Sequence, residues 1–559
     1  MLRACALWTS ALVLAGCGGP TEVQLTLLGT TDVHGYLLPY DYATDRLREG
    51  SLAQVVSLVD SIRGADPHVL LFDSGDLLQG SALNSYRAAL GSRRGETASP
   101  RPAGSPHPVI AAMNAAGYAA SAVGNHEFNY GVPYLERTLA DARFPFLAAN
   151  IRRAGTDSTA FPPYAILRAG PLRVGVVGLT TPGVAIWDRA NVEGRLEFDD
   201  LVESARRWLP PLREKSDLIV VVAHSGLGPG SSYAQETGVP EENAVARLAH
   251  ELPEIAVIFG GHAHVRIAGR RVGPTLVLEA GRFADVLAVA HLTLRKEGGR
   301  WRVTESVGEL LSSGDAPPAE AIVRAVRADH ERTLAWLREP IGYTPDRWSA
   351  AKARFEDTPI ADLITRVEQQ VSGAELASTA IFDPGAAFGP GPITRRHILG
   401  LYIYPNTLKV VRISGADLQV YLDRSARYYR TWSDGPLVND SVPGYNFDVL
   451  SGAEYALDLR RPAGHRVIGL RRAGRAVLPT DSFTLALNNY RQSGGGGFQR
   501  VAGAPVVFSA EREIADLIID FVRARDTLRI ADVHRRNWRL LPDEAASRLG
   551  REAAAAGRH

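Results

Sequence analysis

Short apolar runs alternate with amphipathic segments over the first half of this 559-residue chain. Each run is rich in Val, Leu or Ile and is bounded by polar or glycine residues, which is typical of buried strands. The expected strands are Val23–Leu28, Val69–Phe72, Ala119–Val123, Arg173–Val177, Leu218–Ala223 and Ile255–Phe259, and the expected helices are Leu52–Ile62, Val109–Ala116, Tyr134–Ala142, Leu201–Arg213 and Asn243–Glu251. This alternation favours an α/β layer architecture with mostly parallel strands.

A second domain follows a change in pattern near Pro317. There a charged helical segment, Glu320–Arg338, begins, and we interpret it as a linker helix because the chain is too long for one ordinary core. The strands expected beyond it are Thr407–Ile413, Phe447–Val449, Tyr455–Leu459 and Ser482–Asn488. The expected organisation is a signal peptide at 1–17, a first domain at 22–316, the linker at 317–340, a second α/β domain at 341–541 and a tail at 542–559, either frayed or a short helix.

The charge balance bears on the kind of partner. Lys and Arg number 62 and Asp and Glu number 61, so the sequence does not favour binding to polymeric nucleic acid. A small anionic substrate remains compatible, since a local site can be basic in a neutral protein.

The N-terminus reads as an export signal. Arg3 precedes the apolar run Ala4–Leu14, which is too short to span a membrane. The run leads into Leu14–Cys17, which resembles the lipobox of bacterial lipoproteins, so cleavage before Cys17 would remove Cys5 and leave the Cys17 thiol to be lipidated. The alternative is an ordinary secretory signal. We expect a lipid-anchored periplasmic or cell-surface protein, at the outer membrane if the source is Gram-negative, with no transmembrane helix.

Residues able to bind metal follow five of the expected strands. They are Asp32 and His34, Asp76, Asn125 and His126, His224, and finally His262 and His264. Loops at the carboxyl ends of such strands converge at one edge of the sheet. Alternate residues of an extended segment point the same way, so Asp32 and His34 are expected to hold one ion together. The same spacing would let His262 and His264 serve two adjacent ions.

The residue types indicate the metal and its chemistry. Imidazoles, carboxylates and one amide suit two borderline divalent ions such as zinc, manganese or cobalt. Two such ions can hold the attacking and leaving oxygens of a phosphoryl transfer and activate water at neutral pH. A lone Asp-x-His or His-x-His is more often a turn or a buried structural histidine. Five motifs in order, each after an expected strand, predict a two-metal site.

These motifs resemble, in order, those of the calcineurin-like metallophosphoesterases, and the string Gly124–Phe128 is similar to that of the 5'-nucleotidases. The resemblance covers Val23 to Leu541 and implies a four-layer α/β/β/α domain joined by a helix to a substrate-binding domain. It implies one metal held by Asp32, His34, Asp76 and His264, a second held by Asp76, Asn125, His224 and His262, and His126 as the catalytic histidine.

The residue three places after His126 distinguishes branches of the family. Most 5'-nucleotidases have Asp there, whereas this chain has Asn129, and Gly124–Gly131 resembles the periplasmic 2',3'-cyclic-nucleotide 2'-phosphodiesterase/3'-nucleotidases. A neutral amide orients the imidazole but supplies no charge. The usual His–Asp pair is therefore absent from the sequence.

The second domain favours the same branch. The stretch Ser378–Phe382 lacks the phosphate-binding Arg of 5'-nucleotidases, and Gly496 stands where they have an Asp that binds free ribose hydroxyls. Three strings, Leu401–Leu408, Tyr445–Val449 and Asn488–Arg491, resemble the cyclic-nucleotide branch. The resemblance implies that Tyr445 and Tyr490 stack on the base, with Asn406 and Asn489 also binding substrate. The alternative is that both tyrosines are packing residues.

The predicted function is metal-dependent hydrolysis of 2',3'-cyclic nucleotides and 3'-nucleotides to nucleoside and phosphate, by a monomer. In the cyclic substrate the 2' bond would break first. One alternative is a 5'-nucleotidase or nucleotide-sugar hydrolase, and a thiosulfate-oxidation hydrolase would share the metal domain. Another is a surface nucleotide-binding lipoprotein that has lost catalysis, which the complete set of predicted ligands disfavours.

Overall fold

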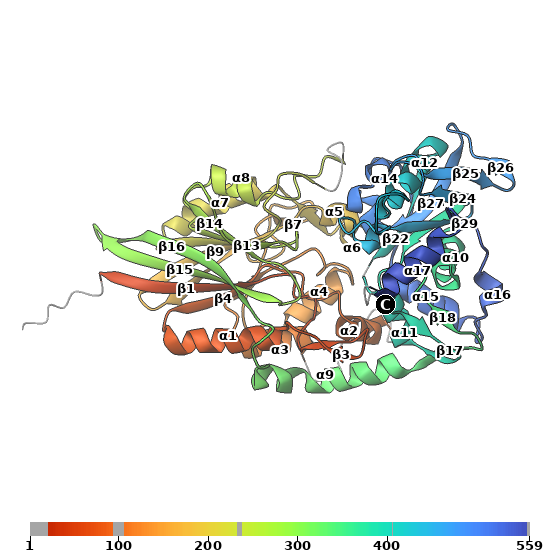
Figure 1. Ribbon diagram of the computed structural model, residues 1–559. Helices are drawn as coiled ribbons and strands as arrows, with labels where there is room; N and C mark the ends of the chain where they lie inside the picture. The colour runs from red at the N-terminus through yellow and green to blue at the C-terminus, as the bar shows by residue number, and fades with distance from the viewer. Residues whose placement is uncertain (1–20, 93–105, 232–236, 405, 556–559) are drawn as a thin grey trace, which may run out of the picture.

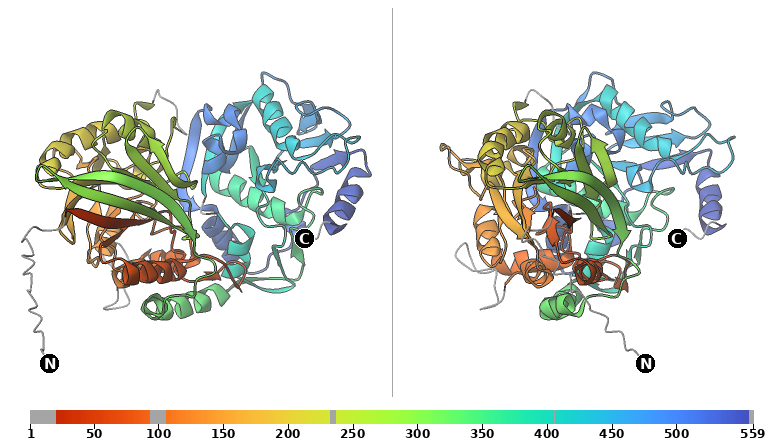
Figure 2. Two further views of the ribbon diagram at one scale, coloured as in Figure 1. Left: turned by 60° about the vertical axis from the view of Figure 1, so that its left-hand side comes forward. Right: turned by 90° about the vertical axis from the view of Figure 1, so that its left-hand side faces the viewer.

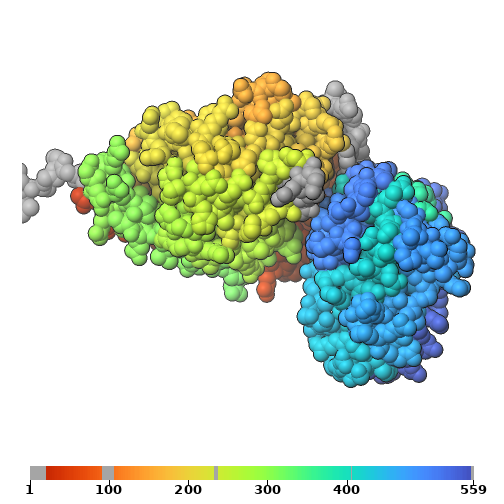
Figure 3. Space-filling model, turned by 90° about the horizontal axis from the view of Figure 1, so that it is seen from above, coloured from red at the N-terminus to blue at the C-terminus, as the bar shows by residue number. Residues whose placement is uncertain are grey.

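The computed structural model describes residues 21–92, 106–231, 237–404 and 406–555. The expected signal peptide with Cys17, and Pro405 in the string Leu401–Leu408, lie outside these residues. Two domains lie side by side (Figure 1) and form separate masses when seen from above (Figure 3). Helix α9 (Glu320–Arg338) has the predicted bounds and packs on both, against α1 to α3 of the first domain and α11 (Arg395–Leu401) of the second (Figure 2).

The first domain contains two six-stranded sheets. One has the order β16-β15-β1-β4-β5-β6, the other β13-β14-β12-β11-β9-β8. The strands of the first are β1 (Glu22–Thr30), β4 (Val69–Asp73), β5 (Ala120–Ala122), β6 (Phe146–Leu147), β15 (Val286–Glu297) and β16 (Arg300–Ser312). Those of the second are β8 (Tyr164–Ala169), β9 (Leu172–Thr180), β11 (Leu218–His224), β12 (Val257–Gly260), β13 (Arg266–Val272) and β14 (Thr275–Ala280).

The prediction of mostly parallel strands is confirmed for the centre of each sheet, and the edge strands are antiparallel. Strands β1, β4, β5 and β6 run parallel, as do β9, β11, β12 and β14, whereas β8, β13 and the β15–β16 hairpin are antiparallel. Gly298 and Gly299 join β15 to β16 with φ of 55° and 82°. Positive φ at both turn residues gives the twist that a two-residue hairpin needs, so no crossover helix intervenes.

The sheets pack face to face with helices outside, which confirms the four-layer α/β/β/α architecture. Between the sheets lies an apolar layer that includes Leu27, Phe72, Phe259 and Leu278. The outer face of the first sheet is covered by α1 (Leu52–Ala65), α2 (Ala82–Ser92) and α3 (Pro108–Ala116), and that of the second by α7 (Leu201–Arg213) and α8 (Val245–Glu251). The parallel strands end at the edge that faces the second domain (Figure 1).

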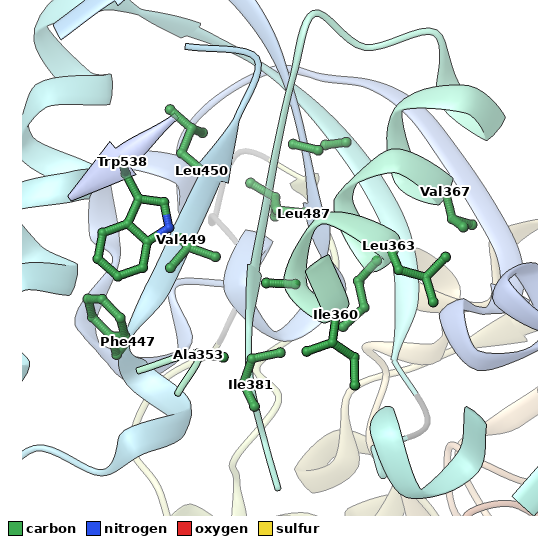
Figure 4. Close-up of a cluster of buried hydrophobic side chains, with 14 of the residues drawn as sticks. Ala353, Ile360, Leu363, Val367, Ile381, Phe447, Val449, Leu450, Leu487 and Trp538 are labelled. Atoms are coloured by element: carbon green, nitrogen blue, oxygen red, sulfur yellow. The ribbon is translucent and has the colours of Figure 1, made fainter. Parts of the chain in front are cut away.

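The second domain has its own core around a five-stranded sheet of order β23-β19-β27-β22-β28. These strands are β19 (Leu376–Ala380), β22 (Thr407–Ser414), β23 (Asp448–Ser451), β27 (Ser482–Asn488) and β28 (Val506–Glu513). Helix α10 (Pro359–Ser372) presents Ile360, Leu363 and Val367 to one side of the sheet, and Phe447 packs on Trp538 on the other (Figure 4). The expected short helix in the tail is α17 (Ala545–Ala555).

The layer between the two sheets predicts a packing conflict at Gly29. A Cβ there would lie 2.3 Å from Cδ1 of Phe259, which the opposite sheet contributes. Gly29→Ala should lower the free energy of unfolding by about 1–3 kcal/mol, because the ring is confined on both sides. In a Phe259→Leu background the same substitution should cost much less. Urea unfolding followed by circular dichroism measures both.

Gly64→Ala is the matched control. Gly64 is exposed in α1 with no neighbour near its added methyl, so alanine should stabilise the helix by about 0.5–1 kcal/mol. An equal loss from Gly29→Ala in both backgrounds would contradict the clash.

Candidate metal centre

Two overlapping groups of metal-binding side chains meet at the edge facing the second domain. The first is Asp32, His34, Asp76 and His264, and the second is Asp76, His224 and His262. Within each group one donor atom of every residue lies within 4.8 Å of the others. Asn125 adjoins the second group, with its Oδ1 2.9 Å from His224 Nε2 and 2.9 Å from His262 Nδ1. Asp76 belongs to both groups and therefore lies between them.

The loops that carry these residues are turns, so the expectation that Asp32 and His34 project from an extended segment is wrong. Strand β1 ends at Thr30, and Asp32 and His34 have φ of 51° and 50°. Their N–H groups donate to Gly75 O and Asp76 O, at 2.9 Å each, which binds this loop to the loop after β4.

The same left-handed conformation recurs at Asp76, His262 and His264, with φ of 64°, 73° and 58°. Non-glycine residues in this region cost about 1–3 kcal/mol each and persist where neighbouring contacts hold them, often at functional sites.

The Glu127 carboxylate holds the two central loops together. It is fully buried, and its Oε2 accepts from Asp76 N at 2.9 Å and Gly124 N at 2.6 Å. Its Oε1 accepts from Leu77 N at 2.6 Å and Leu78 N at 3.1 Å. Burial raises the pKa of Glu127, and these N–H groups oppose that rise. No role was predicted for Glu127 from the sequence. Its place directly before an apolar residue, Phe128, is a signal in the sequence that its carboxylate is buried.

The hydrogen bonds of His34 and His224 orient both rings so that a metal ion could bind between them. His34 Nδ1 lies 2.9 Å from Gln79 O and His224 Nδ1 lies 2.9 Å from Ser74 O. A carbonyl oxygen only accepts, so both Nδ1 atoms carry hydrogen, and the Nε2 atom of each ring faces inward, where its lone pair would bind a metal ion.

In the structure these inward Nε2 atoms lie near carboxylate oxygens. His34 Nε2 lies 3.9 Å from Asp76 Oδ2, and His224 Nε2 lies 3.1 Å from it. The buried Asp32 Oδ1 accepts no hydrogen bond, although His264 Nε2 lies 3.1 Å away. Burial would lower the pKa of His224, yet Asp76 and Asp32 raise it to about 10. The centre thus favours positive charge, and its donors fit divalent metal ions.

The Glu242 carboxylate, which belongs to neither group, orients His262. The Nε2 atom of His262 lies 2.7 Å from Glu242 Oε1, and the His262 ring stacks on Trp187 with centroids 5.4 Å apart. A buried carboxylate that accepts from one ring nitrogen turns the other toward the metal position. Sequence analysis missed Glu242, which belongs to no motif and precedes α8 in a loop.

His126 lies beside these groups and is linked to two further side chains. Its Nε2 is 3.9 Å from Asp76 Oδ2, and its Nδ1 is 2.6 Å from Asn129 Oδ1. Asn129 Nδ2 then donates to both oxygens of Asp188, at 3.0 Å each. Asp188 is buried, with 7% of its surface exposed. The structure therefore brings together His126 and Asn129 as predicted, and adds Asp188, which sequence analysis missed.

The two tyrosines of the second domain are exposed, Tyr445 by 39% and Tyr490 by 43%. A buried arginine, Arg491, connects their segments. It forms a bidentate ion pair with Asp448, at 2.8 and 2.7 Å, and donates to Tyr445 O at 2.9 Å. Burial raises the pKa of Tyr490, and the nearby Tyr445 adds to that rise.

The two predicted substrate-binding amides also take part in the fold. Asn489 Oδ1 accepts from Thr407 N at 3.1 Å, which holds the start of β22. The backbone carbonyl of Asn406 accepts from Ile514 N at 2.8 Å.

Two positions where 5'-nucleotidases carry polar groups have no such group here. Gly496 has φ of 75°, and a Cβ would lie 2.3 Å from Asn446 Oδ1 and 2.5 Å from Arg491 Nη1. An Asp there would displace these two side chains and place a non-glycine residue at positive φ. The ring of Phe382 stands edge-to-face against Tyr404, with centroids 4.8 Å apart, so this end of Ser378–Phe382 is aromatic.

The domains make contact next to the metal centre. Gln79 Nε2 donates to Glu513 Oε1 of the second domain at 2.7 Å, while Gln79 O accepts from His34. Burial raises the pKa of Glu513 to about 7. One residue therefore contacts both the predicted metal ligands and the second domain.

Two facing sheets whose loops carry this donor set define a calcineurin-like phosphoesterase, and residues 25–266 match that family model. Residues 340–503 match the C-terminal domain of 5'-nucleotidases. A Salmonella typhimurium protein named 2',3'-cyclic-nucleotide 2'-phosphodiesterase/3'-nucleotidase is 31% identical, over 97% of this chain and 92% of its own. A Yersinia enterocolitica protein of the same name is 31% identical over 93% and 88%.

A solved Staphylococcus aureus structure, described as a 5'-nucleotidase, matches with a TM-score of 0.72 and 28% identity, over 93% of this chain and all of that one. The chain belongs to the 5'-nucleotidase family of metal-dependent phosphoesterases.

The contact between His262 and Glu242 predicts how metal affinity responds to a change outside the donor set. Glu242→Gln should weaken the binding of a divalent ion about 10–100-fold, because the amide no longer fixes the ring orientation of His262. Titration of the apo-protein with Mn²⁺, read by isothermal calorimetry, measures the change. Glu305→Gln, at an exposed position of β16, is the control. Equal affinities for both variants would contradict the orienting role.

Proposed function

We propose that this enzyme hydrolyses 2',3'-cyclic nucleotides to 3'-nucleotides and then to nucleoside and phosphate. The observation that carries the proposal is Gly496, which has no side chain to bind free ribose hydroxyls and where an added Cβ would clash with the Asn446 and Arg491 side chains. A substrate whose 2' and 3' oxygens are tied to phosphorus does not need one. The names of the relatives at 31% identity support the same reaction.

The proposed ligands of one metal are Asp32, His34, Asp76 and His264, and those of the other are Asp76, Asn125, His224 and His262. Zinc, manganese or cobalt suits this mixture of imidazole, carboxylate and amide. Two such ions, when bound, supply an activated water and bind phosphoryl oxygens. Glu127 accepts hydrogen bonds from the loops of Asp76 and Asn125 and so fixes the positions of these donors relative to each other.

His126 is the proposed catalytic histidine, with Asn129 as its partner. Because Nδ1 of His126 is occupied by Asn129, its Nε2 remains to face the reacting phosphate. In its protonated form, with hydrogen on both nitrogens, the ring there offsets the charge that grows on the phosphoryl oxygens, or donates the Nε2 proton to the leaving ribose oxygen. After the 2' bond of a cyclic nucleotide breaks, the remaining monoester meets the same group for the second hydrolysis.

Tyr445 and Tyr490 are proposed to stack on the base, with Asn406 and Asn489 nearby in the same site. Two observations support this role. Both rings are exposed at the surface, and Arg491 holds the backbone segments that carry them. Stacking on an aromatic ring is worth about 1–3 kcal/mol per base and accepts any base. A broad base specificity follows.

The remaining proposals concern the chain as a whole. We propose domains at 22–316 and 341–541 joined by a linker at 317–340, a tail at 542–559, and a monomer. We also propose export through residues 1–17 and anchoring by a lipid on Cys17, in the periplasm or at the cell surface. None of the helices in the described part of the chain combines the length and apolar character that a bilayer-spanning helix needs.

Release of phosphate and nucleoside from 2',3'-cyclic AMP, 3'-AMP and 5'-AMP, compared with Mn²⁺ present, tests the substrate class. We expect fast turnover of the first two and slow turnover of 5'-AMP, because Gly496 offers no contact to a free ribose hydroxyl. Preference for 5'-AMP would overturn the proposal.

Tyr490→Ala, measured in the same assay, tests whether this ring stacks on the base. Loss of one stacking surface should raise KM about 5–150-fold, the equivalent of about 1–3 kcal/mol. Tyr343→Ala, at a tyrosine of β17 (Pro340–Thr344) that is 48% exposed, is the matched control. Equal KM values for the two variants would argue that Tyr490 only packs.

Anchoring is tested by membrane fractionation of cells that express the full chain. The wild type should sediment with membranes and incorporate labelled palmitate, whereas Cys17→Ser should do neither, because the thiol is the proposed site of lipid attachment. A soluble, unlabelled wild type would favour an ordinary secretory signal.

A further inference from the structure

Asp188 lies at the end of a hydrogen-bonded chain that starts at His126. His126 Nδ1 is 2.6 Å from Asn129 Oδ1, and Asn129 Nδ2 is 3.0 Å from each oxygen of Asp188. His126 and Asn129 share the loop after β5, whereas Asp188 comes 59 positions after Asn129, in a separate turn. The chain supplies a carboxylate near the histidine even though position 129 itself is neutral.

The geometry fixes which way the Asn129 amide faces. A carboxylate accepts hydrogen bonds and an amide NH₂ group only donates them, so Asp188 selects the orientation with Nδ2 toward itself. The amide oxygen is then turned to His126, whose Nδ1 must carry the hydrogen. The imidazole is held in one tautomer, and its Nε2 faces Asp76 Oδ2 at 3.9 Å.

Asp188 is itself held in place. It lies in the turn between α5 (Val184–Trp187) and α6 (Arg189–Val192), and its N–H donates to Val184 O at 3.0 Å. Asn191 Nδ2 bridges the pair, donating to Asp188 Oδ1 at 3.3 Å and to Asn129 O at 3.2 Å. A buried carboxylate with this many contacts can orient a neighbour without moving.

We propose that Asp188 is a positioning residue for the phosphoester hydrolysis, acting through Asn129 to set the orientation and tautomer of His126. Through Asn129, Asp188 orients the imidazole as a carboxylate hydrogen-bonded directly to the ring would. The proposal rests on the proposed role of His126 but not on the identity of the nucleotide.

Asp188→Asn should lower kcat about 100-fold with KM within about threefold of the wild type, because the groups that bind substrate are untouched while a positioned acid–base group contributes about 10²–10⁴-fold. An amide at 188 permits Asn129 to flip, and a flipped Asn129 presents NH₂ to His126 and selects the other tautomer. Asp157→Asn, an exposed aspartate of the same domain, is the matched control and should leave kcat unchanged.

The exchange of the two side chains distinguishes positioning from packing. Asn129→Asp alone sets two carboxylates 3.0 Å apart and should also lower kcat. The double variant Asn129→Asp, Asp188→Asn restores one carboxylate and one amide, now with the carboxylate accepting directly from His126. Its kcat should recover to within about tenfold of the wild type. Losses that add in the double variant would contradict the coupling of the two side chains through His126.

Two choices keep this test separate from that of the substrate. Rates are measured on bis(p-nitrophenyl) phosphate, a phosphodiester without a base, at equal Mn²⁺ content. The tautomer of His126 is read independently of activity from ¹⁵N shifts of histidine-labelled protein, assigned with His126→Gln. We expect Nδ1–H in the wild type and a shift toward Nε2–H in Asp188→Asn. An unchanged tautomer, or a double variant no faster than either single variant, would overturn the proposal.

Discussion

The Glu127 carboxylate accepts four backbone N–H groups from the loops after β4 and β5, and the geometry of the metal centre depends on it. Those loops carry Asp76, which both groups of donors share, and Asn125. A buried carboxylate is costly unless it is fully hydrogen-bonded. Here that requirement forces two loops to turn inward together. The left-handed residues at the centre are stable because this anchor and the pairing of neighbouring loops hold them.

A buried ion pair has the corresponding position in the second domain. Arg491 and Asp448 are 1% and 3% exposed, and the guanidinium also binds the carbonyls of Tyr445 and Gly495. Such a pair contributes little net stability, yet the removal of one partner is strongly destabilising. Its value lies in geometry: one planar group fixes both tyrosine segments and the glycine loop that excludes a side chain at 496. Each domain thus uses one buried ionisable side chain to hold the segments that carry its candidate site residues.

The relation between His126 and Asp188 shows that a carboxylate can stand near a histidine even where the sequence motif lacks one. Position 129 is neutral, and the negative charge stands instead at Asp188, one hydrogen bond further away. The sequence motif shows only that position 129 lacks a carboxylate. The compensating residue lies in a turn between two short helices, where no periodic pattern marks it.

The sequence by itself determined six strands and five helices of the first domain, four strands of the second, the bounds of α9, and the residue types that meet at the edge of the sheets, because hydrophobic periodicity and strand ends are local properties. Only the tertiary structure decided the antiparallel edges, the left-handed turns at Asp32 and His34, and the contacts of Glu242 and Asp188. These depend on atoms brought together from distant parts of the chain, and a hydrogen bond between two loops leaves no trace in the pattern of either one.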